Sequence, residues 1–261
     1  MILDELADTA RGRVAAARER VPESELRAEV LAFPRRPLGF AAALAKPGLS
    51  LICEVKKASP SKGVIDPDFD YRAIAADYEA AGADAVSCLT EPSRFLGSDD
   101  VFRAVRGQVT CPMLRKDFTV DAYQLYEARL MGADAVLLIC AILDDAELAH
   151  GLALADELGL DTLVEAHDEA EVERALAAGA RIIGVNNRDL RDFTVDPHRA
   201  ERFRRLVPDD VLFVAESGVG AAADLEGLVS QGVDAALVGE FLMRSDDRAA
   251  TMARMREAAA R

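Results

Sequence analysis

The sequence predicts an α/β fold, a single (β/α)8 TIM barrel with an N-terminal helical extension. The chain has 261 residues, close to the roughly 250 that this fold usually takes. Short apolar runs return eight times between segments of helical period, which is typical of parallel strands alternating with helices. Four helix-to-strand joints have nearly the same sequence, GADAV, GADAV, GARII and GVDAA. Together these observations favour eight consecutive βα units.

The extension comes first along the chain. We expect one or two helices in residues 1–45, packed against a barrel that spans residues 46–261 of one domain, with PRRPLG as the joint. The start, MILDELADTARGRVAAARERV, is amphipathic and lacks the basic and continuously apolar regions of a signal peptide. Its basic residues are expected to form a solvated helix face.

The eight expected strands follow at intervals of roughly 20 to 34 residues, as βα units require. They are the runs SLICEV from 50, DAVSCL from 84, CPMLRK from 111, DAVLLI from 134, DTLVEA from 161, RIIGVN from 181, VLFVAE from 211 and DAALVG from 234. An open doubly wound sheet is the alternative, but it usually has fewer strands and a G-x-G-x-x-G motif after the first strand. That motif is absent here.

Composition limits the partners and the compartment. The formal net charge is −15, with 31 basic and 46 acidic residues, which argues against general affinity for nucleic acid or anionic membranes. No apolar run approaches the roughly 20 residues of a membrane span. Four cysteines without metal-binding spacing are interpreted as reduced core thiols, Cys53, Cys88, Cys111 and Cys140. We therefore expect a cytoplasmic protein that binds a small molecule at a local site.

Charged and polar side chains follow the apolar runs, at the barrel end where active sites form. They are Glu54 and Lys56 after the first strand, Lys116 after the third, Glu165 after the fifth, Asn186 and Arg188 after the sixth, and Glu216 and Ser217 after the seventh. Three carboxylates and two lysines are thus expected at one mouth. A carboxylate and an ammonium on one strand face must be paired or used. For Glu54 and Lys56 we expect both, since the pairing would keep Lys56 charged and aimed into the mouth. Lys57 should point the other way.

Each of these residues also has a structural explanation. Glu54 and Lys56 could form an ion pair at the rim, and Lys116 could be a solvated lysine. Glu165 could lie near a helix N-terminus, and Glu216 could belong to a turn. Their joint occurrence on separate strands favours function. The histidines are expected in surface or capping roles: His150, His167 and His198.

Glycines after the last two strands suggest an anion site. Gly218 and Gly220 follow the seventh strand, and Gly239 and Glu240 follow the eighth. In barrels these loops commonly bind phosphate through backbone N–H groups. Ordinary turns would explain each glycine equally well, and the Glu240 side chain must turn away from a phosphate that its N–H meets.

In the same order along the chain, these motifs resemble the indole-3-glycerol phosphate synthase family. They are EVKKASPSKG, FLGS, LRKDF, VEAH, GVNNRDL, AESGV and LVGEFLM. The resemblance covers most of the chain. It implies a step of tryptophan biosynthesis, in which 1-(2-carboxyphenylamino)-1-deoxyribulose 5-phosphate closes an indole ring with loss of carbon dioxide and water. It also implies that no cofactor or metal is used.

The resemblance further implies a role for each site residue. Lys116 would protonate the developing alkoxide, Glu165 would transfer protons, and Lys56 would hold the substrate carboxylate. Glu54 and Asn186 would orient Lys56 and the substrate hydroxyls, and Glu216 with Ser217 would complete the polar ring. Contacts to the phosphate would come from Ser59, Arg188, Gly218, Gly239 and the N–H of Glu240, where the family often has serine. The anthranilate ring would pack against Pro60, Phe95, Phe118 and Leu190.

Two other functions remain as alternatives. Phosphoribosylanthranilate isomerase shares the barrel and the phosphate site, but it uses a Cys/Asp acid–base pair that strands one and five do not supply. A catalytically silent barrel could bind a sugar phosphate as a sensor or scaffold. Such a module needs the glycines but not two lysines and three glutamates. The expected state is a monomer or weak homo-oligomer.

Overall fold

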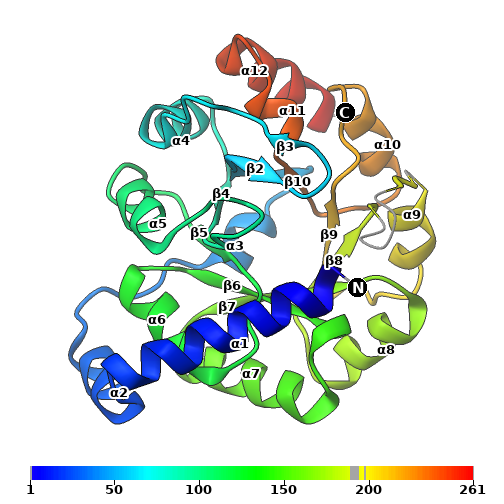
Figure 1. The fold of residues 1–261 in the computed structure, drawn as a ribbon. Helices are drawn as coiled ribbons and strands as arrows, with labels where there is room; N and C mark the ends of the chain where they lie inside the picture. The colour runs from blue at the N-terminus through cyan, green and yellow to red at the C-terminus, as the bar shows by residue number, and fades with distance from the viewer. Residues whose placement is uncertain (1, 189–193, 197, 261) are drawn as a thin grey trace.

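The computed structural model describes residues 2–188, 194–196 and 198–260, and it confirms the barrel (Figure 1). Within these residues, eight parallel strands close in the order β1, β10, β9, β8, β7, β6, β5, β4. They are β1 (Ser50–Val55), β4 (Ala85–Leu89), β5 (Met113–Lys116), β6 (Ala135–Ile139), β7 (Asp161–Ala166), β8 (Ile182–Asn186), β9 (Leu212–Glu216) and β10 (Ala235–Val238). Each begins within two residues of its predicted run. A short antiparallel pair, β2 (Ala58–Ser59) and β3 (Gly63–Val64), lies in the loop after β1.

Helices surround the strands. After the extension they are α4 (Tyr71–Ala80), α5 (Asp99–Arg106), α6 (Ala122–Met131), the 3-10 turn η1 (Cys140–Ile142), α7 (Asp145–Glu157), α8 (Glu169–Ala177), α9 (Arg199–Arg204), α10 (Asp224–Ser230), α11 (Glu240–Met243) and α12 (Arg248–Ala259). Several begin at an N-cap aspartate or serine whose side chain accepts a backbone N–H, as in Asp121 and Asp144. None of the described helices is long and apolar enough to cross a membrane.

The extension holds three helices among its described residues, whereas the sequence predicted one or two. They are α1 (Ile2–Arg20), α2 (Glu23–Ala32) and α3 (Phe40–Leu44). Only five residues long, α3 is too short to show a helical period. It closes the amino-terminal end of the barrel, where Ser50 Oγ donates a hydrogen bond to the carbonyl of Leu44. In Figure 1, α1 runs as one straight helix across the view of the barrel.

The repeated helix-to-strand joint has a structural purpose. The aspartate of three joints, Asp84, Asp134 and Asp234, accepts a hydrogen bond from a backbone amide in a neighbouring strand. The donor amides belong to Leu51, Met113 and Phe213. Asp134 is fully buried and also pairs with Arg35 and Arg106. These joints therefore fix the end of the barrel opposite the strand carboxyl ends.

The core is aliphatic and has two parts. The larger cluster lies between the strands and the helices. The smaller cluster fills the barrel interior and includes Ile52, Leu114, Leu137 and Leu163. The interior is therefore packed below the mouth, as in other barrels of this class, and it leaves the strand carboxyl ends as the place for a site.

Candidate active site

A cavity of about 660 Å³ opens at the carboxyl ends of the strands. Every predicted site residue that the structure describes lines it: Glu54, Lys56, Ser59, Pro60, Phe95, Lys116, Phe118, Glu165, Asn186, Arg188, Glu216, Ser217, Gly218, Gly239 and Glu240. The remaining predicted residue, Leu190, lies outside the described residues. The structure therefore brings the described members of the predicted set together at one cavity.

A lysine between two glutamates forms the centre of the cavity. Lys116 Nζ, at the end of β5, lies 3.3 Å from Glu165 Oε2 on β7 and 3.3 Å from Glu216 Oε2 on β9. Both carboxylates are almost fully buried. Asn186 Nδ2, at the end of β8, donates to Glu165 Oε1 over 3.3 Å. The polar residues that end four strands thus form one contact network.

Burial and charge act in opposite directions on these groups. Burial alone would lower the pKa of Lys116, but Glu216 and Glu165 raise it well above its usual value. Burial alone would raise the pKa of Glu165, but Lys116 and then His167 lower it well below its usual range. Burial raises the pKa of Glu216 to about 7, although Lys116 acts against this increase. The site therefore holds a charged lysine, an ionised glutamate and a glutamate that titrates near neutrality.

Gly184 gives Glu216 its place in the barrel. A Cβ at position 184 on β8 would overlap the Glu216 carboxyl group, at Oε1. That oxygen is buried and has no hydrogen-bond partner among the described residues. Sequence reasoning missed Gly184, although a glycine inside an apolar strand is a signal of close approach.

Glu54 and Lys56 form the ion pair that the sequence predicted. Strand β1 ends at Val55, so Lys56 lies just beyond the strand and reaches back to the Glu54 carboxylate. Gly239 makes this possible, because a Cβ there would overlap Glu54 Oε2 and crowd Lys56 Nζ. Lys57 does not line the cavity, and its Nζ lies 6.0 Å from the centre of the Phe69 ring. The prediction that Lys57 points elsewhere is therefore confirmed.

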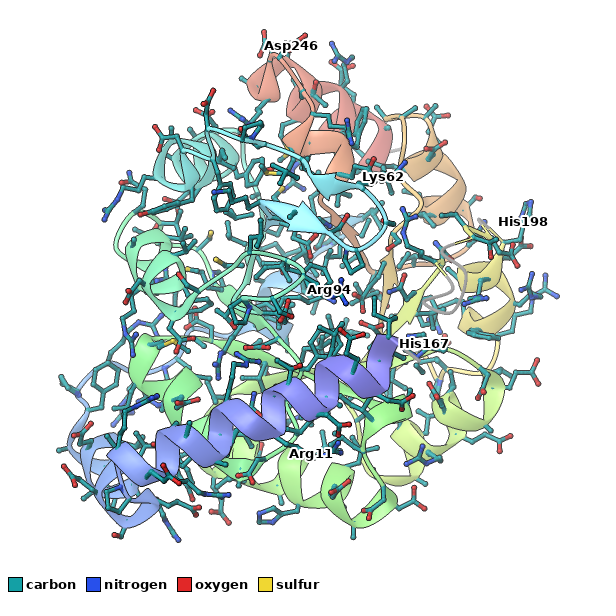
Figure 2. The ribbon with its side chains drawn as sticks, viewed as in Figure 1. Arg11, Lys62, Arg94, His167, His198 and Asp246 are labelled. Carbon is teal, nitrogen blue, oxygen red and sulfur yellow. The ribbon has the colours of Figure 1, made fainter. Side chains whose placement is uncertain are left out.

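His167 corrects the sequence prediction of a surface or capping role. Its Nε2 lies 3.0 Å from Glu165 Oε1, and its Nδ1 lies 3.1 Å from Glu171 Oε2 on α8. Only 15% of the side chain is exposed. Figure 2 shows His198 at the outer edge of the molecule and His167 nearer the barrel axis. A histidine two residues after a strand-end carboxylate could have signalled this contact.

Two aromatic rings form an apolar wall. The centres of Phe95 and Phe118 lie 6.3 Å apart. The buried Glu91 carboxylate accepts the backbone N–H of Phe95 and those of two preceding residues, and so fixes the loop after β4. A Cβ at Gly97 would overlap the carbonyl of Leu89. The loop FLGS can therefore close only with glycine at this point.

The far end of the cavity is rich in cations. Glu240, the first residue of α11, lies among three of them. Its Oε1 is 3.2 Å from Arg244 Nε and 3.6 Å from Lys62 Nζ, and its Oε2 is 3.8 Å from Arg188 Nη2. Sequence analysis included Arg188 here but missed Lys62 and Arg244. The Glu240 side chain thus has partners of its own.

The loop after β9 turns sharply beside this cluster. Ser217 and Gly218 have φ angles of 62° and 88°, a left-handed conformation that is uncommon for serine. The backbone N–H of Gly220 donates to Asp224 Oδ2 over 2.8 Å. Gly220 lines the cavity, but its amide already has this partner.

Helix α1 supplies a wall that sequence analysis missed. Ile2, Leu3 and Leu6 line the cavity. Arg13 binds Asp117, the residue after Lys116, through two hydrogen bonds of 3.0 and 2.6 Å. Arg13 is therefore not part of a solvated face, in contrast to the sequence prediction. The charge pattern of α1 alone did not distinguish an anchor from a surface residue.

The fold and the site define a class: a (β/α)8-barrel enzyme whose cavity gathers paired lysines and glutamates. Within the described residues, no group of three or more His, Cys, Asp or Glu side chains is placed to hold a metal ion. The profile of the family described as indole-3-glycerol phosphate synthase matches residues 3–255. The chain therefore belongs to the indole-3-glycerol phosphate synthase family.

Similar proteins agree with this assignment. An indole-3-glycerol phosphate synthase of Ruminiclostridium cellulolyticum is 51% identical over 99% of this chain and 100% of its own length. One of Endomicrobium trichonymphae is 47% identical over 98% of this chain and 100% of its own length. Among solved structures, 3-hexulose-6-phosphate synthase from Salmonella typhimurium has a TM-score of 0.64 at 14% identity, covering 81% of this chain and 98% of that chain. That likeness supports the fold alone.

Proposed function

We propose that the chain converts 1-(2-carboxyphenylamino)-1-deoxyribulose 5-phosphate to indole-3-glycerol phosphate, with release of carbon dioxide and water. The observation that carries the proposal is the buried contact of Lys116 with Glu165 and Glu216 at the mouth of the barrel. Membership of the indole-3-glycerol phosphate synthase family supports the same reaction.

Lys116 acts in the first step. The ring carbon that bears the carboxylate attacks the ketone carbon of the ribulose chain, and the ketone oxygen becomes an alkoxide. A proton from the Lys116 ammonium turns that alkoxide into a hydroxyl group. The two glutamates that keep Lys116 charged make it a proton donor at this position.

The later steps need groups at two places around the new ring. Loss of carbon dioxide leaves its electron pair in the ring and removes the positive charge formed on the nitrogen. The hydroxyl group then leaves as water with a proton from an acid, while a base removes a proton from the ring. Glu165, held ionised by its neighbours, is the base that we favour. Lys56 holds the substrate carboxylate before it leaves, and Glu54 orients Lys56.

The ends of the cavity fit the two ends of the substrate. Phe95 and Phe118, with Pro60, give the anthranilate ring an apolar surface. Arg188 and the neighbouring cations supply charge for the phosphate, together with Ser59, Gly218, Gly239 and the N–H of Glu240. Asn186, Glu216 and Ser217 remain for the hydroxyl groups between them. Leu190, which the family resemblance adds as a ring contact, lies outside the described residues.

We place this reaction in the cytoplasm, on a monomer or weak homo-oligomer that requires neither cofactor nor nucleic acid. The formal charge of −15 supports a small phosphorylated substrate held at a local site over a nucleic-acid partner. Light scattering of the purified protein across a range of concentrations measures its oligomeric state.

The proposal is tested by supplying the substrate to the purified protein. We expect the product, measured by its indole fluorescence, and carbon dioxide to form in equal amounts, without added metal or cofactor. A folded protein that produces neither signal contradicts the proposal. Fluorescence without carbon dioxide contradicts the proposed loss of the carboxylate.

A further inference from the structure

His167 stands between two carboxylates that come from different elements. Its Nε2 lies 3.0 Å from Glu165 Oε1 on β7, although this pair does not reach hydrogen-bond alignment. Its Nδ1 lies 3.1 Å from Glu171 Oε2 on α8, and the same oxygen accepts the His167 backbone N–H over 2.7 Å. Glu171 thus holds both the ring and the backbone of His167.

The contact acts on one oxygen of Glu165. Lys116 lies against Oε2, whereas Asn186 and His167 lie against Oε1. The ring of His167 therefore limits rotation of the carboxylate about its last bond. It also offers a donor on the side opposite Lys116.

Other charged and titratable groups around this pair come from every neighbouring element. Lys116 on β5 and Glu216 on β9 face Glu165. Cys140 in η1 lies near both Glu165 and Glu171, and burial raises the pKa of its thiol to about 12, so it stays neutral. On α8, Arg174 interacts electrostatically with Cys140 and Glu171, and Asp168 with Cys140. His167 is thus the cation in contact with both Glu165 and Glu171 among the described residues.

We propose that His167, held by Glu171, is a positioning residue that orients the Glu165 carboxylate and keeps it ionised for proton transfer. The inference rests on the proposed function and adds to it a pair of residues, His167 and Glu171, outside the cavity lining. The charge state agrees with this role. Burial alone would lower the pKa of His167, but its two carboxylate contacts raise it to about 10.

The central variants are His167→Gln, which keeps a hydrogen-bond donor but loses the charge, and Glu171→Gln. We expect His167→Gln to lower kcat about 10-fold or more, the size of effect typical of residues that orient a catalytic group. KM should change little, because His167 does not line the cavity. The acidic limb of the kcat profile should move to higher pH, since Glu165 loses a neighbouring positive charge. His167→Asn is a second variant of the same kind.

The link through Glu171 is tested by a double-mutant cycle. If Glu171 acts through His167, the variant carrying both changes loses no more activity than His167→Gln alone. The matched control is His198, whose Nδ1 lies 3.3 Å from Glu201 Oε2 on an exposed helix start. His198→Gln should leave kcat and the pH profile unchanged.

A measurement without turnover separates this inference from the proposed function. Carboxyl NMR of the ¹³C-labelled protein, with Glu165 assigned through Glu165→Gln, follows its titration in each variant. We expect the Glu165 titration to move to higher pH in His167→Gln and not in His198→Gln. An unmoved titration overturns the inference even in an active enzyme. If the Glu165 titration moves in a protein that lacks synthase activity, the result supports the role of His167 and Glu171 and contradicts the proposed function.

Discussion

Lys116 keeps its charge at a place where burial acts to lower its pKa. Glu165 and Glu216 each place a carboxylate oxygen 3.3 Å from Lys116 Nζ and outweigh the effect of burial on the pKa of this lysine. This arrangement explains how a buried lysine stays charged at this place. A lysine without these neighbours would be neutral more often and would donate less readily.

The first prediction concerns this lysine. Lys116→Ala should lower kcat by about 10²–10⁴, the usual contribution of a general acid, while substrate affinity changes little. Single-turnover kinetics and a separate binding titration distinguish the two effects. Lys57→Ala is the control, since Lys57 lies outside the cavity lining. A Lys116→Ala enzyme with ordinary turnover contradicts the assigned role.

The second prediction concerns Gly239. In Gly239→Ala the new Cβ overlaps the Glu54 carboxylate and crowds Lys56, so the ion pair must move. We expect a loss of kcat/KM of about 10-fold or more, because displacement of a positioning group is costly to rate. Gly227→Ala is the matched control, since nothing lies within 4 Å of a Cβ there. Equal activity of the two variants contradicts the prediction.

The third prediction concerns pH and stability. The two carboxylate contacts raise the pKa of His167 in the folded chain to about 10, above the usual value of 6.5, so protonation of His167 favours the folded state. Its contribution is full below pH 6.5 and is lost as the pH rises through 10. Urea unfolding of the wild type and His167→Gln should therefore show a difference that shrinks from pH 6.5 to 10. A difference that grows over this interval contradicts the assignment.

At the scale of elements, α1 joins the extension to the active site. Its first turns line the cavity, and Arg13 binds Asp117 directly after Lys116. Asp117 is fully shielded in its side chain and also accepts a hydrogen bond from Thr90 over 2.6 Å. The helix is thus tied to the segment that directly follows Lys116.

The fourth prediction tests this tie. Arg13→Ala should loosen α1 and raise KM several-fold, because the wall formed by Ile2, Leu3 and Leu6 depends on the position of the helix. Loss of a partner from a buried acceptor should lower stability by about 1–3 kcal/mol. Steady-state kinetics and urea unfolding measure the two effects. Arg11→Ala, which removes an exposed pair with Asp8, is the control and should change neither.

The elements were largely predictable from sequence, because the apolar runs and the Gly-ended helices repeat along the chain. What sequence analysis missed are contacts that form only when the elements pack together. Arg13 looks like any basic residue on an amphipathic helix, since its partner Asp117 lies 104 residues away. His167 looks like a loop histidine until β7 and α8 bring it between Glu165 and Glu171. Spacing carries no signal for the Arg13–Asp117 pair, whereas the short spacing from Glu165 to His167 could have signalled the histidine contact.

At the scale of the whole molecule, the two ends of the barrel differ in what their charged residues do. The carboxyl ends of the strands carry the cavity, whereas the opposite end carries the aspartate joints. This division is usual in (β/α)8 barrels. It allows charged residues to serve different purposes at the two ends.

The fifth prediction follows from this division. Asp134→Ala leaves Arg35 and Arg106 without their fully buried partner, so the folded state should lose about 3–5 kcal/mol. Thermal unfolding should show a clear fall in Tm, while kcat of the folded enzyme at 25 °C stays near the wild-type value. Asp145→Ala removes an exposed pair and should change stability by about 0–1 kcal/mol. A large loss of kcat in folded Asp134→Ala contradicts the division.

Glu240 gives the proposed phosphate end a counter-ion of its own. Its carboxylate already neutralises part of the charge of Arg244, Lys62 and Arg188. A phosphate that binds there must compete with the Glu240 carboxylate for these cations, because the cations already have an anionic partner. Free inorganic phosphate, which gains nothing from the rest of the cavity, should therefore be a poor competitor, and the whole substrate is selected over its fragments.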